Sequence, residues 1–290
     1  MRVGNGFSNK TISIHVLVLK IEKLDYLCVH SVNGVYRTIY QIAAYSIMKT
    51  YIRRREKNNH LVVLYGGWGT DENVFTPFCN DEFDFILFYN YSADEALVLP
   101  EMKTYKKITL IGWSLGVWAA EYLSHKTGIK PDVTIAVNGT PVPADDMYGI
   151  PLNIFEGTLN NITEENIDKF YFRMFGDKKS YQSNIERVPH RTLKSLHDEL
   201  RWLYNRIMEQ KDPGFKWDYA VTSEIDRVFP SKNLAGYWEK EKNTKNIVLQ
   251  LPHYLFNEWK SFTEFIDFVE NYQTKKPSKR EIAGKKSKDL

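Results

Sequence analysis

A serine between two glycines is the first group in this sequence that could act as a nucleophile. Ser114 stands in the stretch Ile111-Gly-Trp-Ser-Leu-Gly116, with apolar residues before it and small residues after it. The pattern Gly-x-Ser-x-Gly is typical of a nucleophile elbow, a sharp strand-to-helix turn that exposes the serine hydroxyl for acyl transfer. An ordinary turn serine can satisfy the same three fixed positions, so the prediction depends on finding the serine's partners.

A general base for Ser114 should follow late in the chain, because hydrolases with this elbow place serine, acid and histidine in that order. Among the seven histidines, only His253 lies just beyond a late apolar segment and shortly before a helical pattern. Asp226 precedes the residues RVFP, a chain reversal that would turn its carboxylate toward the imidazole. We therefore predict Ser114 as nucleophile, His253 as base and Asp226 as the acid that orients the imidazole.

Other carboxylates could take the orienting role. Glu224 lies two residues before Asp226 in the same predicted loop. Asp145 and Asp146 follow an earlier predicted strand, after Asn138. We favour Asp226 because it follows the strand that precedes the histidine, but both alternatives remain open from the sequence.

Two backbone N–H groups should bind the oxyanion that forms during acyl transfer. One belongs to Leu115, directly after the serine. The other is predicted at Trp68, in the loop LYGGWGTD that follows the first strongly apolar segment. Gly67 would let this loop pass close to the substrate, so we assign it to the substrate site. The alternative is a glycine-rich turn with a packing tryptophan.

The order of strands and helices predicts the scaffold that must position these groups. From Met48 onward, short apolar segments alternate with helical patterns, which predicts an α/β protein with a mostly parallel sheet and helices on both faces. A short strand after Met48 is followed by buried strands at 61–65, 83–88, 108–112, 133–137, 219–221 and 247–251. Helices are predicted at 117–123 and 259–269.

A long helical insertion interrupts this alternation before the strand that carries the acid. Thr163 fits a helix N-cap, with Glu164 and Glu165 favourably placed in the first turn. A longer helix follows, in which leucines recur at three- and four-residue spacing from Leu193 to Leu203. We predict a helical cap at about 149–215, lying over a pocket.

Composition and motifs exclude several classes of function. The 290 residues include 43% hydrophobic and 26% charged residues, which are ordinary globular values. Two cysteines are too few for a disulfide framework, so we expect a reducing, cytoplasmic location. The sequence has no apolar run long enough to span a membrane, no metal-ligand spacing, no P-loop and no G-x-G-x-x-G. We expect a hydrolase without metal or cofactor.

The two ends of the chain differ from its middle. Residues 1–47 show no clear succession of helices and strands, and we predict a weakly structured extension, with Met48 as the functional start. Residues 274–290 hold seven Lys or Arg and two acidic residues, with almost no apolar residues. Such a basic tail could touch nucleic acid or membrane, but we favour a disordered, solvated end and expect neither partner. The hydrolase domain is predicted at 48–273.

Five segments together resemble the BioG-type pimeloyl-[acyl-carrier protein] methyl ester esterases, a family with the α/β-hydrolase fold. They are GGWGTDENVF, GWSLGVWAA, NGTPVPADDMYGIP, FEGTLNNITEENIDKFYFRMFG and LPHYLFNEW. The resemblance runs from about Met48 to about Gln273. It implies a serine carboxylesterase that hydrolyses the methyl ester of pimeloyl-acyl carrier protein to pimeloyl-acyl carrier protein and methanol in biotin biosynthesis. GGWG and GWSLG also resemble the BioH-type esterases, whose acid and base lie in positions like Asp226 and His253.

The implied substrate adds further expectations. A pimeloyl chain would need an apolar tunnel under the cap, which we predict to be lined by Phe155, Phe170 and Phe175. Acyl carrier proteins are acidic, so their docking surface should be basic. The residues predicted for docking are Arg173, Lys178, Lys179, Arg187, Arg191, Lys194 and Arg201. A solvated helix face is the alternative explanation of that cluster, and a general carboxylesterase or thioesterase acting on another short acyl ester is the alternative function. We expect a monomer.

Overall fold

The computed structural model describes residues 16–21, 24–29, 48–54, 58–80, 82–92, 104–209 and 214–273. The chain divides into two units, Met1–Tyr45 and Ser46–Leu290. In the first unit, β1 (Val16–Ile21) pairs antiparallel with β2 (Leu24–Val29). The rest of the predicted extension at 1–47, apart from these strands, and the basic tail at 274–290 lie outside the described residues. Every residue predicted to take part in the chemistry lies in the second unit.

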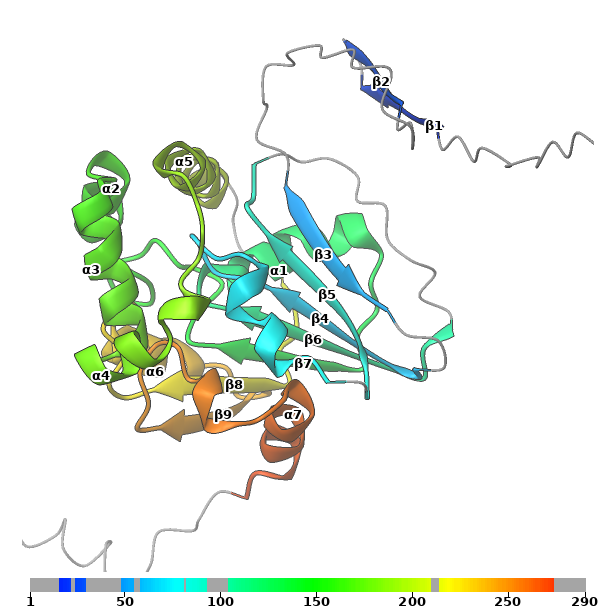
Figure 1. The fold of residues 1–290 in the computed structure, drawn as a ribbon. Helices are drawn as coiled ribbons and strands as arrows, with labels where there is room; N and C mark the ends of the chain where they lie inside the picture. The colour runs from blue at the N-terminus through cyan, green and yellow to red at the C-terminus, as the bar shows by residue number, and fades with distance from the viewer. Residues whose placement is uncertain are drawn as a thin grey trace, which may run out of the picture. The chain divides into compact units, whose positions relative to one another are not determined.

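A seven-stranded sheet in the order β3-β5-β4-β6-β7-β8-β9 forms the centre of the second unit (Figure 1). β3 runs antiparallel to β5, and all the other neighbours are parallel. The strands are β3 (Lys49–Arg53), β4 (His60–Tyr65), β5 (Asp84–Tyr89), β6 (Lys107–Trp113), β7 (Val133–Val137), β8 (Tyr219–Ser223) and β9 (Lys245–Leu249). The predicted mostly parallel α/β sheet is confirmed.

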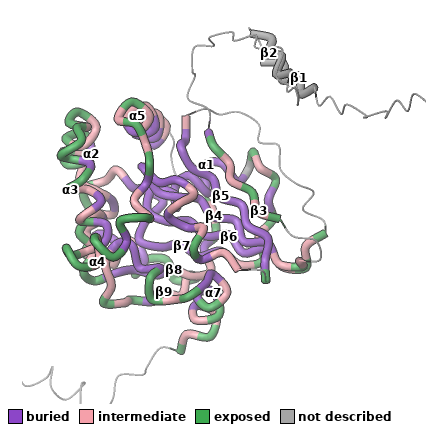
Figure 2. The backbone as a smooth tube through the Cα atoms, in the orientation of Figure 1, coloured by how far each residue is buried: buried purple, intermediate pink, exposed green. Residues whose placement is uncertain are grey.

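The burial of the strands explains why they could be recognised in the sequence as apolar segments. All six residues of β5 are buried, and β4 and β6 are buried except at their first residues. Strands covered on both faces read as continuous apolar runs rather than as alternating patterns. β9, at the edge of the sheet, mixes buried, half-buried and exposed residues. Figure 2 shows this burial through the central strands and the exposed outer surface of the cap helices.

Three helices accompany the strands. They are α1 (Leu115–Thr127) after β6, α6 (Ser231–Trp238) between β8 and β9, and α7 (Phe262–Asn271) after β9. The predicted helix at 259–269 begins three residues later than expected. Ser261 is its N-cap, since the Ser261 side chain accepts a hydrogen bond from the backbone N–H of Glu264. Short 3₁₀ helices lie at η1 (Glu72–Val74), η2 (Thr76–Phe78), η4 (Ile185–Arg187) and η5 (Phe256–Glu258).

Four helices form the insertion between β7 and β8. They are α2 (Leu152–Asn160), α3 (Glu164–Phe175), α4 (Lys178–Ser183) and α5 (Leu193–Glu209). Thr163 caps α3 by accepting from the N–H of Asn166, as its place before two glutamates predicts. Figure 1 shows these helices, which we call the cap, gathered beyond the end of the sheet toward which β7, β8 and β9 point.

Candidate active site

Ser114 occupies a strained turn between β6 and α1. Its φ of 57° and ψ of −128° lie in a region that non-glycine residues rarely adopt. A side chain at Gly116 would place its Cβ only 2.0 Å from the carbonyl oxygen of Tyr65, so only glycine lets α1 start this close to β4. The turn has the conformation and the close packing of a nucleophile elbow.

Asp226 and His253 meet at the carboxyl ends of β8 and β9. The Asp226 Oδ2 atom lies 2.7 Å from His253 Nδ1, and the two side chains are 0% and 1% exposed. The other carboxylate oxygen, Oδ1, accepts from the N–H groups of Val228 at 2.7 Å and Phe229 at 2.8 Å. Both oxygens therefore have partners, which fixes the direction of the carboxylate and, through it, of the imidazole.

The alternative acids are engaged elsewhere. Asp145 Oδ1 accepts from the N–H groups of Met147 at 2.8 Å and Tyr148 at 2.7 Å, inside its own turn. Asp146 Oδ1 accepts from the N–H of Leu152 at 2.9 Å, and Glu224 is exposed. Among the carboxylates that the structure describes, Asp226 is the one hydrogen-bonded to His253.

Two residues that the sequence analysis missed hold the histidine's backbone. The carbonyl oxygen of His253 accepts from Trp113 Nε1 at 3.1 Å and from Asn138 Nδ2 at 2.8 Å. Asn138 also donates to Ser223 Oγ at 2.8 Å. Trp113 and Asn138 stand at the ends of β6 and β7, beside Ser114. The sequence could have indicated both residues, because residues at the carboxyl ends of neighbouring parallel strands lie close together.

The predicted oxyanion loop, residues 66–71, runs directly against the serine. A Cβ added at Gly67 would lie 2.9 Å from Ser114 Cβ, so the glycine is required by this close approach. The backbone N–H groups of Trp68 and Leu115 donate to no acceptor among the described residues. Two unpaired donors flanking a nucleophile are the arrangement that binds an oxyanion. In the same part of the chain, no hydrogen bond joins the Ser114 hydroxyl to the His253 ring; such contacts are often long in ligand-free sites.

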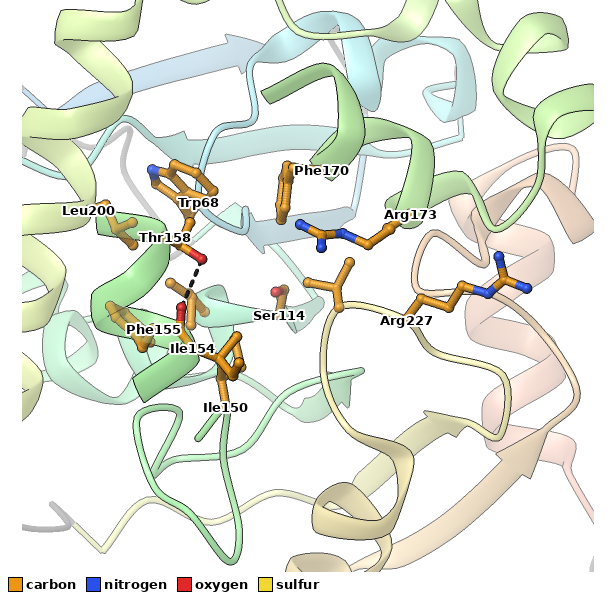
Figure 3. A pocket seen from close by; sticks show the side chains of 12 residues that line it. Trp68, Ser114, Ile150, Ile154, Phe155, Thr158, Phe170, Arg173, Leu200 and Arg227 are labelled. Carbon is orange, nitrogen blue, oxygen red and sulfur yellow. Dashed lines mark hydrogen bonds between the residues drawn. The ribbon is translucent and has the colours of Figure 1, made fainter. Parts of the chain in front are cut away.

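A cavity opens over Ser114 between the sheet and the cap, with about 660 Å³ of empty space including its mouth (Figure 3). Its wall is mostly apolar and combines residues of the elbow and oxyanion loop with residues of α2, α3 and α5. The lining residues are Trp68, Ser114, Leu115, Ile150, Ile154, Phe155, Thr158, Phe170, Arg173, Leu200, Arg227 and Val228. In Figure 3, Ile150, Ile154 and Phe155 lie on one side of Ser114, and Arg173 and Arg227 lie on the other.

Comparisons with known proteins bear on this site. The family described as pimeloyl-ACP methyl esterase BioG matches residues 48–265. The chain belongs to the BioG family. The crystal structure of BioG from Haemophilus influenzae is 31% identical, with a TM-score of 0.66, and the match covers 75% of this chain and 99% of that one. An esterase from Exiguobacterium antarcticum shares the fold, with 16% identity, a TM-score of 0.58 and coverage of 77% and 96%.

One relative is much longer than the matched region. A malonyl-[acyl-carrier protein] O-methyltransferase of Bacteroides fragilis strain 638R is 38% identical over 183 residues, which cover 63% of this chain. The match spans only 37% of that relative's length. The name of the longer protein therefore describes more than the part that resembles this BioG-family chain.

The predicted apolar tunnel is only partly matched by the cavity of this BioG-family chain. Phe155 and Phe170 line it, and the Phe170 ring lies 4.9 Å from the Trp68 ring. Phe175 does not line it, which corrects our prediction. Its ring packs 5.0 Å from Tyr254 in the core, because a separation of five positions places Phe175 on a different face of α3 from Phe170.

Some of the predicted docking residues are exposed, and others contact residues of the same chain. Arg173, Lys178, Lys179, Lys194 and Arg201 are exposed, and of these Arg173 lines the cavity. Lys194 forms an ion pair with Asp198 on the same helix face. Arg187 is half-buried; it donates to Asn257 Oδ1 and lies over the ring of Phe78.

Arg191 corrects the docking prediction. Its side chain is 4% exposed and pairs with the fully buried carboxylate of Glu199 at 3.2 Å. A guanidinium buried in this way has no free surface for a partner protein. Arg227, by contrast, was not predicted as a site residue. It lines the cavity and directly follows Asp226 in the sequence.

Two further observations concern metals and membranes. Among the described residues, no group of three or more His, Cys, Asp and Glu side chains lies close enough to hold a metal ion. In the same part of the chain, no helix is both long and apolar enough to cross a membrane.

Proposed function

We propose that this chain is a serine carboxylesterase that hydrolyses the methyl ester of pimeloyl-acyl carrier protein to pimeloyl-acyl carrier protein and methanol, a step of biotin biosynthesis. The observation that carries the proposal is a serine in an elbow turn at the floor of an apolar cavity, at the same sheet edge as a buried Asp226–His253 pair. Membership of the BioG family supports the methyl ester and the carrier protein as substrate.

The residues have distinct roles in the proposed reaction. His253 takes the proton of Ser114 as the serine oxygen attacks the ester carbonyl, and Asp226 stabilises the imidazolium without taking the proton. The N–H groups of Trp68 and Leu115 bind the oxyanion of the tetrahedral intermediate. When the intermediate collapses, methoxide leaves with the proton held by His253 and departs as methanol.

A second half-reaction frees the acyl chain. His253 removes a proton from water, which attacks the acyl-serine ester, and the same two N–H groups bind the second oxyanion. Collapse breaks the bond to Ser114, and the imidazolium returns its proton to the serine oxygen. The products are the carboxylate of the pimeloyl chain, still attached to its carrier, and the free enzyme.

The walls of the cavity suit such a substrate. Apolar side chains of the cap, among them Ile154, Phe155 and Phe170, would contact the methylene chain. The exposed cations at Arg173 and Arg227, together with Lys178, Lys179 and Arg201, would attract an acidic carrier. The B. fragilis relative is named for methylating an acid on a carrier protein, and an esterase for the same kind of ester is its chemical complement.

Purified protein tests the proposal directly. We expect hydrolysis of methyl pimeloyl-carrier protein, loss of that activity in Ser114→Ala, and wild-type activity in the control Ser183→Ala, which changes an exposed serine of α4. Hydrolysis retained by Ser114→Ala would contradict the triad assignment.

Substrate comparison separates the alternative function. A higher kcat/KM for the carrier-linked ester than for dimethyl pimelate is expected if the carrier protein is recognised. Equal values for both esters, or faster cleavage of a pimeloyl thioester, would favour a general carboxylesterase or a thioesterase. Growth of a biotin-requiring strain that lacks its esterase, supported by the wild type and not by Ser114→Ala, would link the activity to biotin synthesis.

A further inference from the structure

A fully buried carboxylate in the cap contacts the oxyanion loop. Glu199, on α5, is 0% exposed and lies outside the proposed triad. Its Oε2 atom accepts from the N–H of Gly69 at 3.1 Å, and its Oε1 atom accepts from the N–H of Tyr91 at 3.1 Å. Arg191 completes the group, because its Nη2 atom lies 3.2 Å from Oε2 and its Nη1 atom donates to the carbonyl oxygen of Thr70 at 2.7 Å.

Other cap residues hold the same loop. Trp68 Nε1 donates to the carbonyl oxygen of Leu196 on α5 at 2.8 Å. The hydroxyl of Tyr171 on α3 donates to the carbonyl oxygen of Gly69 at 3.0 Å. The indole of Trp68 and both polar groups of Gly69 are thus tied to the cap. The N–H of Trp68, the predicted oxyanion donor, belongs to the residue whose indole is anchored and which directly precedes Gly69.

Stability alone is a weak reason for this arrangement. Burying a charge is costly unless it is paired and hydrogen-bonded, and an apolar replacement of a buried ion pair is often as stable or more stable. Glu199 and Arg191 are fully satisfied, and three of the groups they contact belong to the loop at residues 66–71 and to the loop that follows β5. Rigid, directed contacts of this kind orient a backbone more tightly than apolar packing does.

We propose that Glu199 is a positioning residue for the oxyanion loop: with Arg191 and Tyr171, it holds the N–H of Trp68 in line with the developing oxyanion. The cap then determines the rate of the chemical step as well as the fit of the acyl chain. The inference rests on the proposed function, since it concerns the same oxyanion hole.

A short ester distinguishes positioning from acyl-chain binding. The acetyl group of p-nitrophenyl acetate does not need the long apolar wall of the cap. We expect Glu199→Gln to lower kcat for this ester by about 10-fold to 100-fold, with KM changed by less than about 2-fold, because displacing a donor by about 1 Å has effects of that size. The control Asp198→Asn changes the neighbouring, solvent-facing carboxylate of α5 and should keep wild-type kcat.

A milder variant covers the case in which Glu199→Gln fails to fold. Tyr171→Phe removes one hydroxyl that contacts Gly69 and leaves the ring in place. We expect its kcat for p-nitrophenyl acetate to fall by about 5-fold, with a small change in melting temperature. Tyr204→Phe is the matched control, since it removes a cap hydroxyl that contacts Glu156 instead of the loop.

The outcomes are separable. If the folded wild-type protein hydrolyses no ester, the proposed function fails before any variant is compared. If the wild type is active, and folded Glu199→Gln or Tyr171→Phe keeps wild-type kcat for the acetate, the positioning role is overturned while the esterase assignment stands.

Discussion

The carboxyl ends of the strands and the cap helices contribute to the same site in different ways. Ser114, Asp226 and His253 each stand on a short segment just beyond the end of a strand, so the register of β6, β8 and β9 brings them together. The cap reaches the site through contacts such as Trp68 to Leu196, which lie 128 residues apart in the sequence. Segments at the strand ends thus carry the proposed reacting groups, and the inserted helices line the cavity and contact the loop at residues 66–71.

This difference predicts where substitutions should be tolerated. Atoms at the carboxyl ends of the strands are crowded by backbone, since a Cβ added at Gly116 would lie only 2.0 Å from the carbonyl oxygen of Tyr65. The outer face of the cap is exposed, and only its inner face carries contacts to the loop and the cavity. Substitutions at the sheet edge should therefore affect chemistry or folding, whereas those in the cap should affect substrate fit or rate according to the face they occupy.

The largest effect is expected at the acid. Asp226→Asn should lower kcat by about 10⁴-fold, because an amide at this position neither holds the required imidazole tautomer nor stabilises the imidazolium. Steady-state kinetics on a p-nitrophenyl ester measures the loss. The control Asp145→Asn should stay within about 2-fold of wild type for kcat, since Asp145 contacts only its own turn. Comparable losses in the two variants would contradict the assignment of Asp226.

Glycine substitutions compare the crowding at the carboxyl ends of the strands with that in the cap. Gly116→Ala should lower the free energy of unfolding by about 3 kcal/mol, because its Cβ has no room beside the backbone of Tyr65. Gly157→Ala, on the cap helix α2, should raise it by about 0.5–1 kcal/mol, since no atom lies within 4 Å of its Cβ and alanine favours the helix. Urea unfolding of both variants measures the difference, and effects of the same sign would remove the contrast.

A cap residue at the mouth tests acyl-chain fit. Ile154→Ala should raise KM for p-nitrophenyl hexanoate by about 3-fold to 10-fold and leave the values for the acetate unchanged, because the cavity wall then offers less apolar contact to a six-carbon acyl chain. Ile154 is 55% exposed, so the fold should be unaffected. The control Ile185→Ala changes an isoleucine that is 54% exposed and does not line the cavity. An equal rise of KM in both variants would argue against the cavity as the acyl site.

The smallest effect concerns His60, the first residue of β4, at the opposite end of this strand from the loop at residues 66–71. Burial, together with the nearby charge of Lys107, lowers the pKa of His60 below 6.5. The folded protein therefore binds fewer protons at this site than the unfolded chain does. The stability contributed by neutral His60 is present above about pH 6.5 and is lost as the pH falls through the lower pKa of the folded state.

Urea unfolding at pH 7.5, 6.5 and 5.5 measures this dependence. Wild-type protein should lose more stability on acidification than His60→Gln. An identical pH dependence in wild type and His60→Gln would show that His60 does not titrate as its burial requires.

The sheet could be predicted from the sequence because strands depend on local patterns, and the residues of the proposed triad lie just beyond predicted strands. Apolar runs marked the strands, and the serine, acid and histidine followed the ends of strands in the order that the fold requires. The start of α7 was predicted three residues early, since the capping role of Ser261 is decided by its own backbone conformation.

What escaped prediction depends on contacts between distant segments. Arg191 read as one of several basic residues on a helical stretch, and only the fold brings its guanidinium against Glu199 and Thr70. Phe170 and Phe175 are both aromatic residues of the predicted cap, yet they lie on different faces of α3, one at the cavity and the other in the core. Helical periodicity identifies a face; it does not identify what that face meets.

The shared acceptor at Glu199 has a consequence for amide hydrogen exchange. Because the N–H groups of Gly69 and Tyr91 both donate to one buried carboxylate of α5, solvent reaches them only when that helix moves away from the loop. Their exchange rates should rise together and by the same factor under any condition that loosens the helix. The exchange rates of these two amides, which lie in separate loops, would then both report how often α5 moves away from the cavity.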